Sequence, residues 1–124
     1  MNEYPIIFAY SRADAIADGV LIDVSEMAKE AGFRYPVAMT SAAWIECVEV
    51  PLSNYYCQDE KGRLWDVLMV MRFAIRADDG GSVVTFCVEV RDKDDMAKRV
   101  DLKAICGPGD DPEPVVTIML PNED

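Results

Sequence analysis

Carboxylates and thiols are the groups of this chain that could take part in chemistry, because its 124 residues include no histidine. Histidine is the commonest general base and a frequent metal ligand, so ordinary acid–base catalysis is not expected. Several carboxylates come in pairs within predicted turns, where they usually form solvated surface rather than a catalytic dyad. These pairs are Asp59/Glu60, Asp78/Asp79, Asp94/Asp95 and Asp110/Asp111.

Asp66 differs from these pairs because it lies in an apolar stretch, between Trp65 and Val67. A carboxyl group in an apolar cleft has a perturbed pKa and is a candidate acid or base. An ion pair with an arginine, or exposure at a helix end, also accounts for such a residue, and we favour this structural interpretation. The catalytic alternative predicts a pocket, and its expected lining residues are Arg34, Tyr35, Trp65 and Asp66.

The four cysteines show no C-x-x-C spacing, so neither a zinc ribbon nor a thioredoxin-type redox motif is expected. Cys87 and Cys106 lie in apolar patterns and are predicted to be buried. Cys57 lies in a predicted loop with acidic neighbours, which raise a thiol pKa and oppose formation of a reactive thiolate. We therefore expect reduced, unreactive thiols in a cytoplasmic protein with no dedicated metal site and no cofactor.

The glycine-rich segment 107–111 suggests a phosphate-binding loop at first sight. It lacks the Lys-Ser/Thr of a P-loop, it opens no helix, and its two carboxylates would repel phosphate. Together with Glu113 these carboxylates do not match the ligand spacing of an EF-hand either. We interpret the segment as a wide turn between two strands.

Glycines and capping residues divide the N-terminal part into short helices. Ser11 is predicted to cap a helix over 12–18, which ends at Gly19. A second helix is expected over 26–31, capped by Asp23 or Ser25 and closed by glycine. The intervening segment 20–24 is too short to be more than an extended bridge.

A third helix is expected from Ala42 to about Glu49, capped by Thr40 or Ser41, with Trp44, Ile45 and Val48 as its apolar face. Residues 51–62 are rich in turn formers and predict a loop. Residues 64–75 are apolar apart from two polar positions, which predicts a central helix that is buried across its middle and wet at both ends.

The hydrophobic period changes from 3.6 to 2 after this helix. Three alternating runs, 83–90, 99–106 and 115–120, are separated by turns and predict an antiparallel meander. A fourth strand is expected from 4–9 or from 35–39. The predicted fold class is therefore α+β: N-terminal short helices and one central helix packed on a C-terminal antiparallel sheet of three to four strands, in a single compact domain over 1–124.

The net charge is −11, from 12 basic and 23 acidic residues. Such a chain is a poor ligand for nucleic acid or for an anionic membrane, and no run approaches the roughly 18 apolar residues of a membrane span. The acidic excess lies in 1–31 and 89–124. The candidate partner-binding carboxylates are Asp92, Asp94, Asp95, Asp110, Asp111 and Glu113.

Four blocks of the sequence resemble a family of small uncharacterised bacterial proteins encoded on plasmids, prophages and other mobile elements. The blocks are Tyr10–Ser25, Gly32–Thr40, Gly62–Leu68 and Gly107–Asp124. The resemblance covers nearly the whole chain and implies a single domain in a mobile-element setting. It implies no activity, substrate or site residue.

Three functions follow as expectations. The first is a non-enzymatic acidic accessory protein that binds a basic protein, in its sharpest form a nucleic-acid mimic that inhibits a CRISPR or restriction complex. The second is a binding or modifying enzyme for a small molecule or nucleotide, with its pocket near Trp65 and Asp66. The third is a homodimeric structural module that uses an exposed sheet edge or Tyr55 and Tyr56, so the chain is expected to be a monomer or a homodimer. Acidity that serves solubility alone is the simplest competing explanation of the charge.

Overall fold

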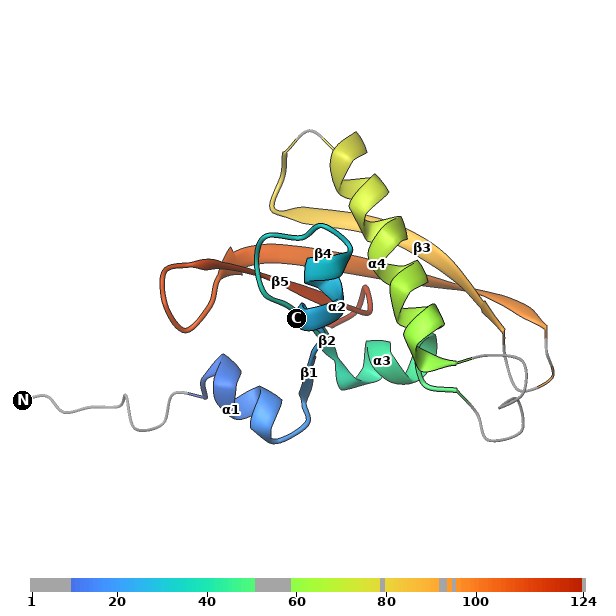
Figure 1. Ribbon diagram of the computed structural model, residues 1–124, viewed down its shortest axis with the longest axis horizontal. Helices are drawn as coiled ribbons and strands as arrows, with labels where there is room; N and C mark the ends of the chain where they lie inside the picture. Colours follow the sequence, from blue (N-terminus) through green and yellow to red (C-terminus); the bar gives the residue numbers. More distant parts are fainter. Residues whose placement is uncertain (1–9, 51–58, 79, 92–93, 95, 124) are drawn as a thin grey trace, which may run out of the picture.

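A five-stranded sheet organises the chain, and the computed structural model describes residues 10–50, 59–78, 80–91, 94 and 96–123 of it (Figure 1). The strand order is β1-β2-β5-β4-β3. The elements along the chain are α1 (Arg12–Ala17), β1 (Leu21–Asp23), α2 (Ser25–Glu30), β2 (Val37–Thr40), α3 (Ser41–Cys47), α4 (Glu60–Ala77), β3 (Val83–Arg91), β4 (Ala97–Pro108) and β5 (Pro114–Met119).

The predicted caps of two short helices are confirmed. The Ser11 hydroxyl accepts from Asp14 N at 2.9 Å, and the Asp14 carboxylate accepts from Ser11 N at 3.3 Å, which is a capping box. Gly19 follows α1 with φ +80°, a conformation that favours glycine. Thr40 caps α3 through its hydroxyl, which accepts from Ala43 N at 3.2 Å.

The predicted cap of α2 is wrong. The residue at the cap position is Val24, which makes no side-chain cap bond, and the helix itself begins at Ser25. Asp23 turns its carboxylate to Ser25 instead, accepting from its backbone N at 3.0 Å and from its hydroxyl at 2.6 Å. The Ser25 hydroxyl also accepts from Val37 N, so this turn fastens α2 to β2.

The antiparallel meander β3–β4–β5 is confirmed, and the fold is α+β as expected. The sheet is nevertheless mixed, because β2 lies parallel to β5, with Val37 opposite Val116. This strand confirms the 35–39 alternative for the fourth strand, and the other alternative, 4–9, lies outside the described residues. The expectation that 20–24 only bridges two helices is wrong, since β1 pairs antiparallel with β2 as a fifth strand.

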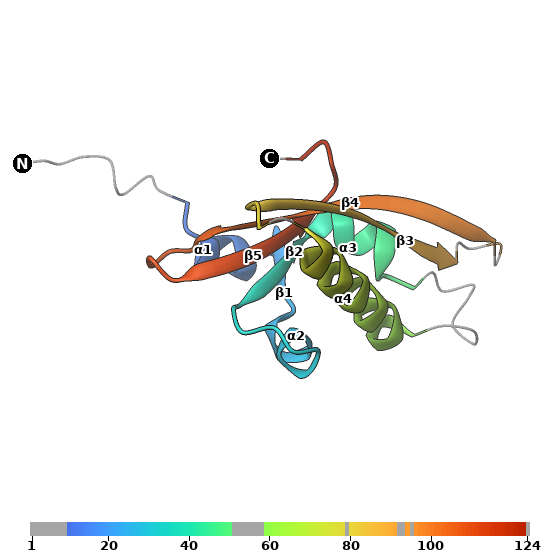
Figure 2. The same ribbon diagram turned by 90° about the horizontal axis from the view of Figure 1, so that it is seen from above.

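Helices α2, α3 and α4 pack on one face of the sheet, and Figure 2 shows α2 and α4 on the same side of it. Alternate residues of the strands fill this core, as the period of two predicts. They include Phe86, Val88, Val100, Leu102 and Ile118. Helix α1 lies on the opposite face, because Arg12 reaches Thr117, which alternates along β5 with the core residues Val116 and Ile118.

Helix α4 is longer than expected. It begins at Glu60, within the segment predicted as a loop, and the part of that segment over 51–58 lies outside the described residues. The expectation of a buried middle with exposed ends is confirmed: residues 67–71 are buried or half-buried, whereas Trp65 near one end is 38% exposed and Phe73 near the other is 64% exposed. Its main contact with the sheet is with β3, the strand at one edge, and α2 and α3 pack against it as well, whereas the side that carries Trp65 and Phe73 remains exposed.

Three more predicted burials are wrong. Ile45 of α3 is exposed, whereas Ala43 and Cys47 point to the core. Cys87 is exposed because it alternates with the buried residues of β3. Cys106 is exposed near the end of β4, past the start of β3 at Val83, where strands no longer enclose it on both sides. Among the described helices, none combines the length and hydrophobicity required to cross a bilayer.

Candidate functional site

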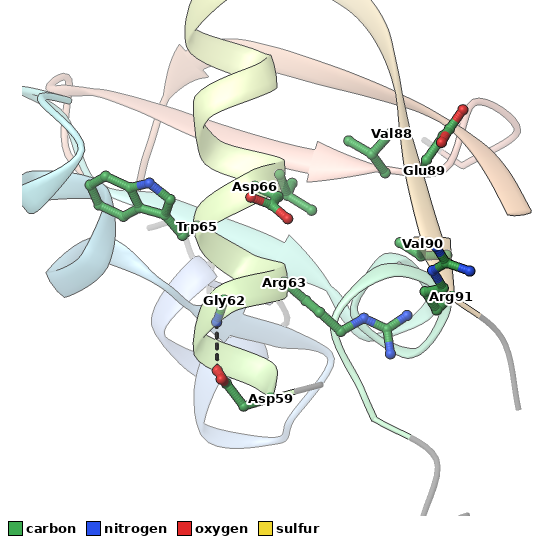
Figure 3. Close-up of a pocket in the computed structure, with 10 residues that line it drawn as sticks. Asp59, Gly62, Arg63, Trp65, Asp66, Val88, Glu89, Val90 and Arg91 are labelled. Carbon is green, nitrogen blue, oxygen red and sulfur yellow. Dashed lines mark hydrogen bonds between the residues drawn. The ribbon is translucent and has the colours of Figure 1, made fainter. Parts of the chain in front are cut away.

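A groove of about 480 Å³ lies between the first half of α4 and the second half of β3 (Figure 3). Asp59, which caps α4, contributes to it, and so do residues from two elements that are distant in sequence. Its lining residues are Asp59, Gly62, Arg63, Trp65, Asp66 and Val67 on the helix side, and Val88, Glu89, Val90 and Arg91 on the strand side. Because the groove depends on how closely α4 approaches β3, no local sequence pattern predicts it.

Arg63 lines this groove and is 9% exposed. Its Nε donates to Cys47 O at 3.1 Å and its Nη1 to Glu49 O at 3.1 Å, which ties α4 to the end of α3. Burial lowers the pKa of the Arg63 guanidinium. The sequence did not indicate Arg63 as a lining residue, because a buried arginine bonded to carbonyls leaves no periodic signal.

Three carboxylates line the groove. Asp59 accepts from Gly62 N at 2.7 Å as the helix cap, and Asp66 and Glu89 are exposed. In Figure 3, Arg63 and Asp66 project from α4 toward β3, whereas the Trp65 ring lies on the other flank of the helix. Because Asp66 is hydrated, it is suited to binding a cationic group rather than to the desolvated acid–base chemistry of an apolar cleft.

The strand side of the groove is an edge of the sheet. Cys106 N donates to Ser82 O at 2.8 Å, and hydrogen-bonded pairs recur at every second residue of an antiparallel ladder. The even-numbered residues of β3 therefore bond to β4, whereas Thr85, Cys87 and Glu89 direct their backbone N–H and C=O groups away from it. Within the described part of the chain, no strand pairs with this side of β3.

The structure brings together two of the four predicted pocket residues, Trp65 and Asp66. Arg34 and Tyr35 are exposed in the connection between α2 and β2 and do not line the groove. The structural interpretation of Asp66 as an exposed helix residue agrees with its position in α4.

The predicted acidic residues divide between two ends of the molecule. Asp94 lies at the turn between β3 and β4, and Asp92 and Asp95 fall outside the described residues. The turn between β4 and β5, beside α1, carries the other three and lies at the opposite end of the long axis (Figure 1). In that turn Asp111 and Glu113 are exposed.

Asp110 has a structural role that the sequence analysis missed. Its Oδ1 accepts from Arg12 N at 2.7 Å and its Oδ2 from Ala13 N at 3.0 Å, so it binds two free amides at the start of α1. The sequence places the two partners 98 residues apart, which hides the contact from local patterns.

Cations and anions are distributed differently in this molecule. Arg12, Arg63 and Arg72 turn inward and donate to backbone carbonyls, Arg12 to Val116 O at 2.9 Å and Arg72 to Ala31 O at 3.1 Å. Every aspartate and glutamate that the structure describes is exposed or half-buried. Some of these carboxylates have a cation beside them, as in the surface pairs Lys98–Glu46 and Arg99–Asp101. With a net charge of −11 and three arginines turned inward, the surface still carries an excess of negative charge.

The described residues contain no cluster of three or more cysteines or carboxylates that could hold a metal ion. In comparison with known proteins, residues 1–124 match a family of unknown function, DUF6573. No curated protein and no solved structure matches the chain.

Proposed function

The chain belongs to this family of unknown function, and we propose that it is a non-enzymatic interaction protein that binds a basic surface of a partner protein. The observation that supports this function best is the uneven placement of charge: three of the seven arginines are bonded to carbonyls inside, whereas every described carboxylate is exposed or half-buried. A surface of one sign steers an oppositely charged partner and competes with other anions for it.

The sharper form of the proposal is an inhibitor encoded on a mobile element. The resemblance of four sequence blocks to proteins of plasmids and prophages supports the setting. Carboxylates at both ends of an elongated molecule can occupy a cationic channel that otherwise holds a nucleic-acid backbone. The expected partners are host complexes that handle nucleic acid, such as CRISPR or restriction complexes.

The proposal is tested by affinity capture from a bacterial host lysate at low salt, with the chain immobilised. Nucleic-acid-handling proteins should be retained and should elute when the salt is raised. The purified partner, loaded with labelled DNA, should then release the DNA when the chain is added, about tenfold less readily at 200 mM than at 50 mM salt.

The matched variants are Asp111→Asn with Glu113→Gln, which removes two exposed charges, and Asn122→Gln, which removes none. The first should weaken DNA release, and the second should leave it unchanged. Capture of no nucleic-acid-handling protein at low salt would contradict the basic-partner proposal. Capture without DNA release would contradict only the sharper proposal, that the chain acts as a nucleic-acid mimic.

A second function, binding or modification of a small molecule, is favoured by the groove beside Trp65 and Asp66. It predicts that a nucleotide or related small molecule quenches tryptophan fluorescence in wild type but not in Trp65→Phe. The hydrated state of Asp66 makes this the weaker proposal.

A further inference from the structure

We infer that the side of β3 away from β4, with which no strand of the described residues pairs, receives an extended, lysine- or arginine-bearing segment of the partner protein as an added strand. This inference rests on the proposed function and names the place and manner of binding. Strand β3 is nine residues long and pairs with β4 without a break from Val83 to Arg91. It contains no proline and no bulge, the devices by which proteins usually protect a sheet edge.

The other edge of the sheet shows the contrast. Strand β1 has three residues, which is too short to accept much of an added strand. On β3, the backbone N–H and C=O groups of Thr85, Cys87 and Glu89 can form hydrogen bonds with an added strand. Both orientations of an added strand can use them, because each of these residues presents a donor and an acceptor.

The groove lies where an added strand would run. Its strand side consists of four successive residues, 88–91. Successive side chains of a strand point to opposite faces of the sheet. Because the groove contacts all four residues 88–91, it extends around the outer edge of β3 from one face of the sheet to the other. Its other wall is the flank of α4 that carries Gly62 and Asp66, one turn apart, with the cap Asp59 before them. An incoming strand would thus pair with β3 and lay one face of its side chains against α4.

The charges of the groove specify those side chains. On the face toward α4, Asp59 and Asp66 present carboxylates, while the guanidinium of Arg63 is engaged by the carbonyls of Cys47 and Glu49. Glu89 alternates with the buried Val88 and Val90 and lies on the other face, opposite Arg99 of β4. Arg91 supplies a cation at one end. Every second residue of the added segment faces the groove, so lysine or arginine at alternate positions is complementary. A second copy of this chain is a poorer occupant, because it brings a further net charge of −11.

The test uses the full chain and two acetylated nonapeptides, one alternating lysine with valine and one alternating glutamate with valine. Amide hydrogen exchange is followed by NMR. In the free protein the amides of Val84, Phe86 and Val88 should be protected by β4, and those of Thr85, Cys87 and Glu89 should exchange quickly. The lysine peptide should slow exchange of these three amides at least about tenfold, and the glutamate peptide should not.

A blocking variant and its matched control add a second readout. Cys87→Pro removes an N–H that faces away from β4 and should lower the affinity for the lysine peptide about tenfold, whereas Cys87→Thr keeps this N–H and should bind like wild type. If Cys87→Pro does not fold, the lysine peptide methylated at alternate backbone nitrogens serves on wild type, and it should bind about tenfold more weakly.

The outcomes separate the two proposals. Lysine-peptide binding without protection of the three amides overturns strand addition and leaves the basic-partner proposal standing. Binding of neither peptide also overturns strand addition, while the lysate capture decides the proposed function on its own. Equal protection by both peptides overturns the charge specificity. Protection that grows with protein concentration in the absence of peptide assigns the edge to a second copy and overturns the proposed occupant.

Discussion

At the scale of single residues, charged side chains form hydrogen bonds that join elements distant in sequence. Asp110 binds the first amides of α1, and Arg12 from that same helix binds Thr117 and Val116 of β5. The two residues together fix α1 against the outer face of the sheet. Sequence analysis identified the α1 cap at Ser11, which lies three residues from its partner, but not Asp110, whose partner is distant in sequence.

The Asp110→Ala variant should therefore be less stable than wild type by about 1 kcal/mol, the usual cost of losing a helix cap. Asp111→Ala, the neighbouring exposed acid, is the matched control and should change the free energy of unfolding by less than about 0.5 kcal/mol. Urea denaturation measures both values. Equal effects of the two substitutions would show that the Asp110 contact carries no stability.

Cys47 makes the stability of the protein sensitive to alkaline pH. Its burial, with Glu46 nearby, raises the pKa of the thiol from 9.0 to about 12. Between these values the unfolded chain loses a proton that the folded chain keeps, so the free energy of unfolding falls as the pH rises above about 9. Below that pH the contribution is fully present.

Urea denaturation at pH 8 and at pH 10 should show this fall in wild type and in Cys87→Ala, whose thiol is exposed. Cys47→Ala should be less stable at both pH values because of the cavity, but its stability should fall less between them. The same slope in all three proteins would mean that other groups govern the alkaline response.

At the scale of elements, α4 shows what hydrophobic pattern predicts and what it does not. Its existence follows from the long apolar run after Asp59. Its orientation does not, because apolar residues occur all round the helix, and its packing against β3, α2 and α3 decides which of them are covered. Leu68 and Met71 are fully buried, whereas Phe73 is largely exposed.

Leu68→Ala should therefore lower the free energy of unfolding by about 3 kcal/mol, the middle of the range for a buried leucine. Phe73→Ala removes a larger side chain from the same helix and should change it by less than about 0.5 kcal/mol. Urea denaturation of both variants tests the assignment. A cost at Phe73 comparable to that at Leu68 would indicate that its flank is covered in solution.

The strands, too, include some that the sequence pattern predicts and some that it does not. The alternating runs of the C-terminal half predict the meander β3–β4–β5 and most of its buried residues. The mixed sheet was not predictable, because β1 is three residues long and the parallel pairing of β2 with β5 joins segments almost eighty residues apart. The groove depends on such distant contacts, so the sequence indicated Trp65 and Asp66 but neither Glu89 nor the side of β3 away from β4.

At the scale of the whole molecule, the outward carboxylates repel one another. Salt screens this repulsion, and the exposed ion pairs Lys98–Glu46 and Arg99–Asp101 contribute too little to reverse the effect. Thermal unfolding should therefore shift upward by about 2–5 °C when sodium chloride rises from about 20 to 500 mM. The shift should be smaller in Asp111→Asn with Glu113→Gln, and a downward shift would contradict net surface repulsion.

The parallel pairing of β2 with β5 also bears on how the chain is made. Val37 emerges early from the ribosome, and its neighbour in the sheet, Val116, emerges near the end of the described chain. Helix α1 likewise forms its contacts with Asp110 and Thr117 only after these residues have been synthesised. The N-terminal third therefore has no complete tertiary surroundings during synthesis, and this high contact order delays its folding until Pro114–Met119 has left the exit tunnel.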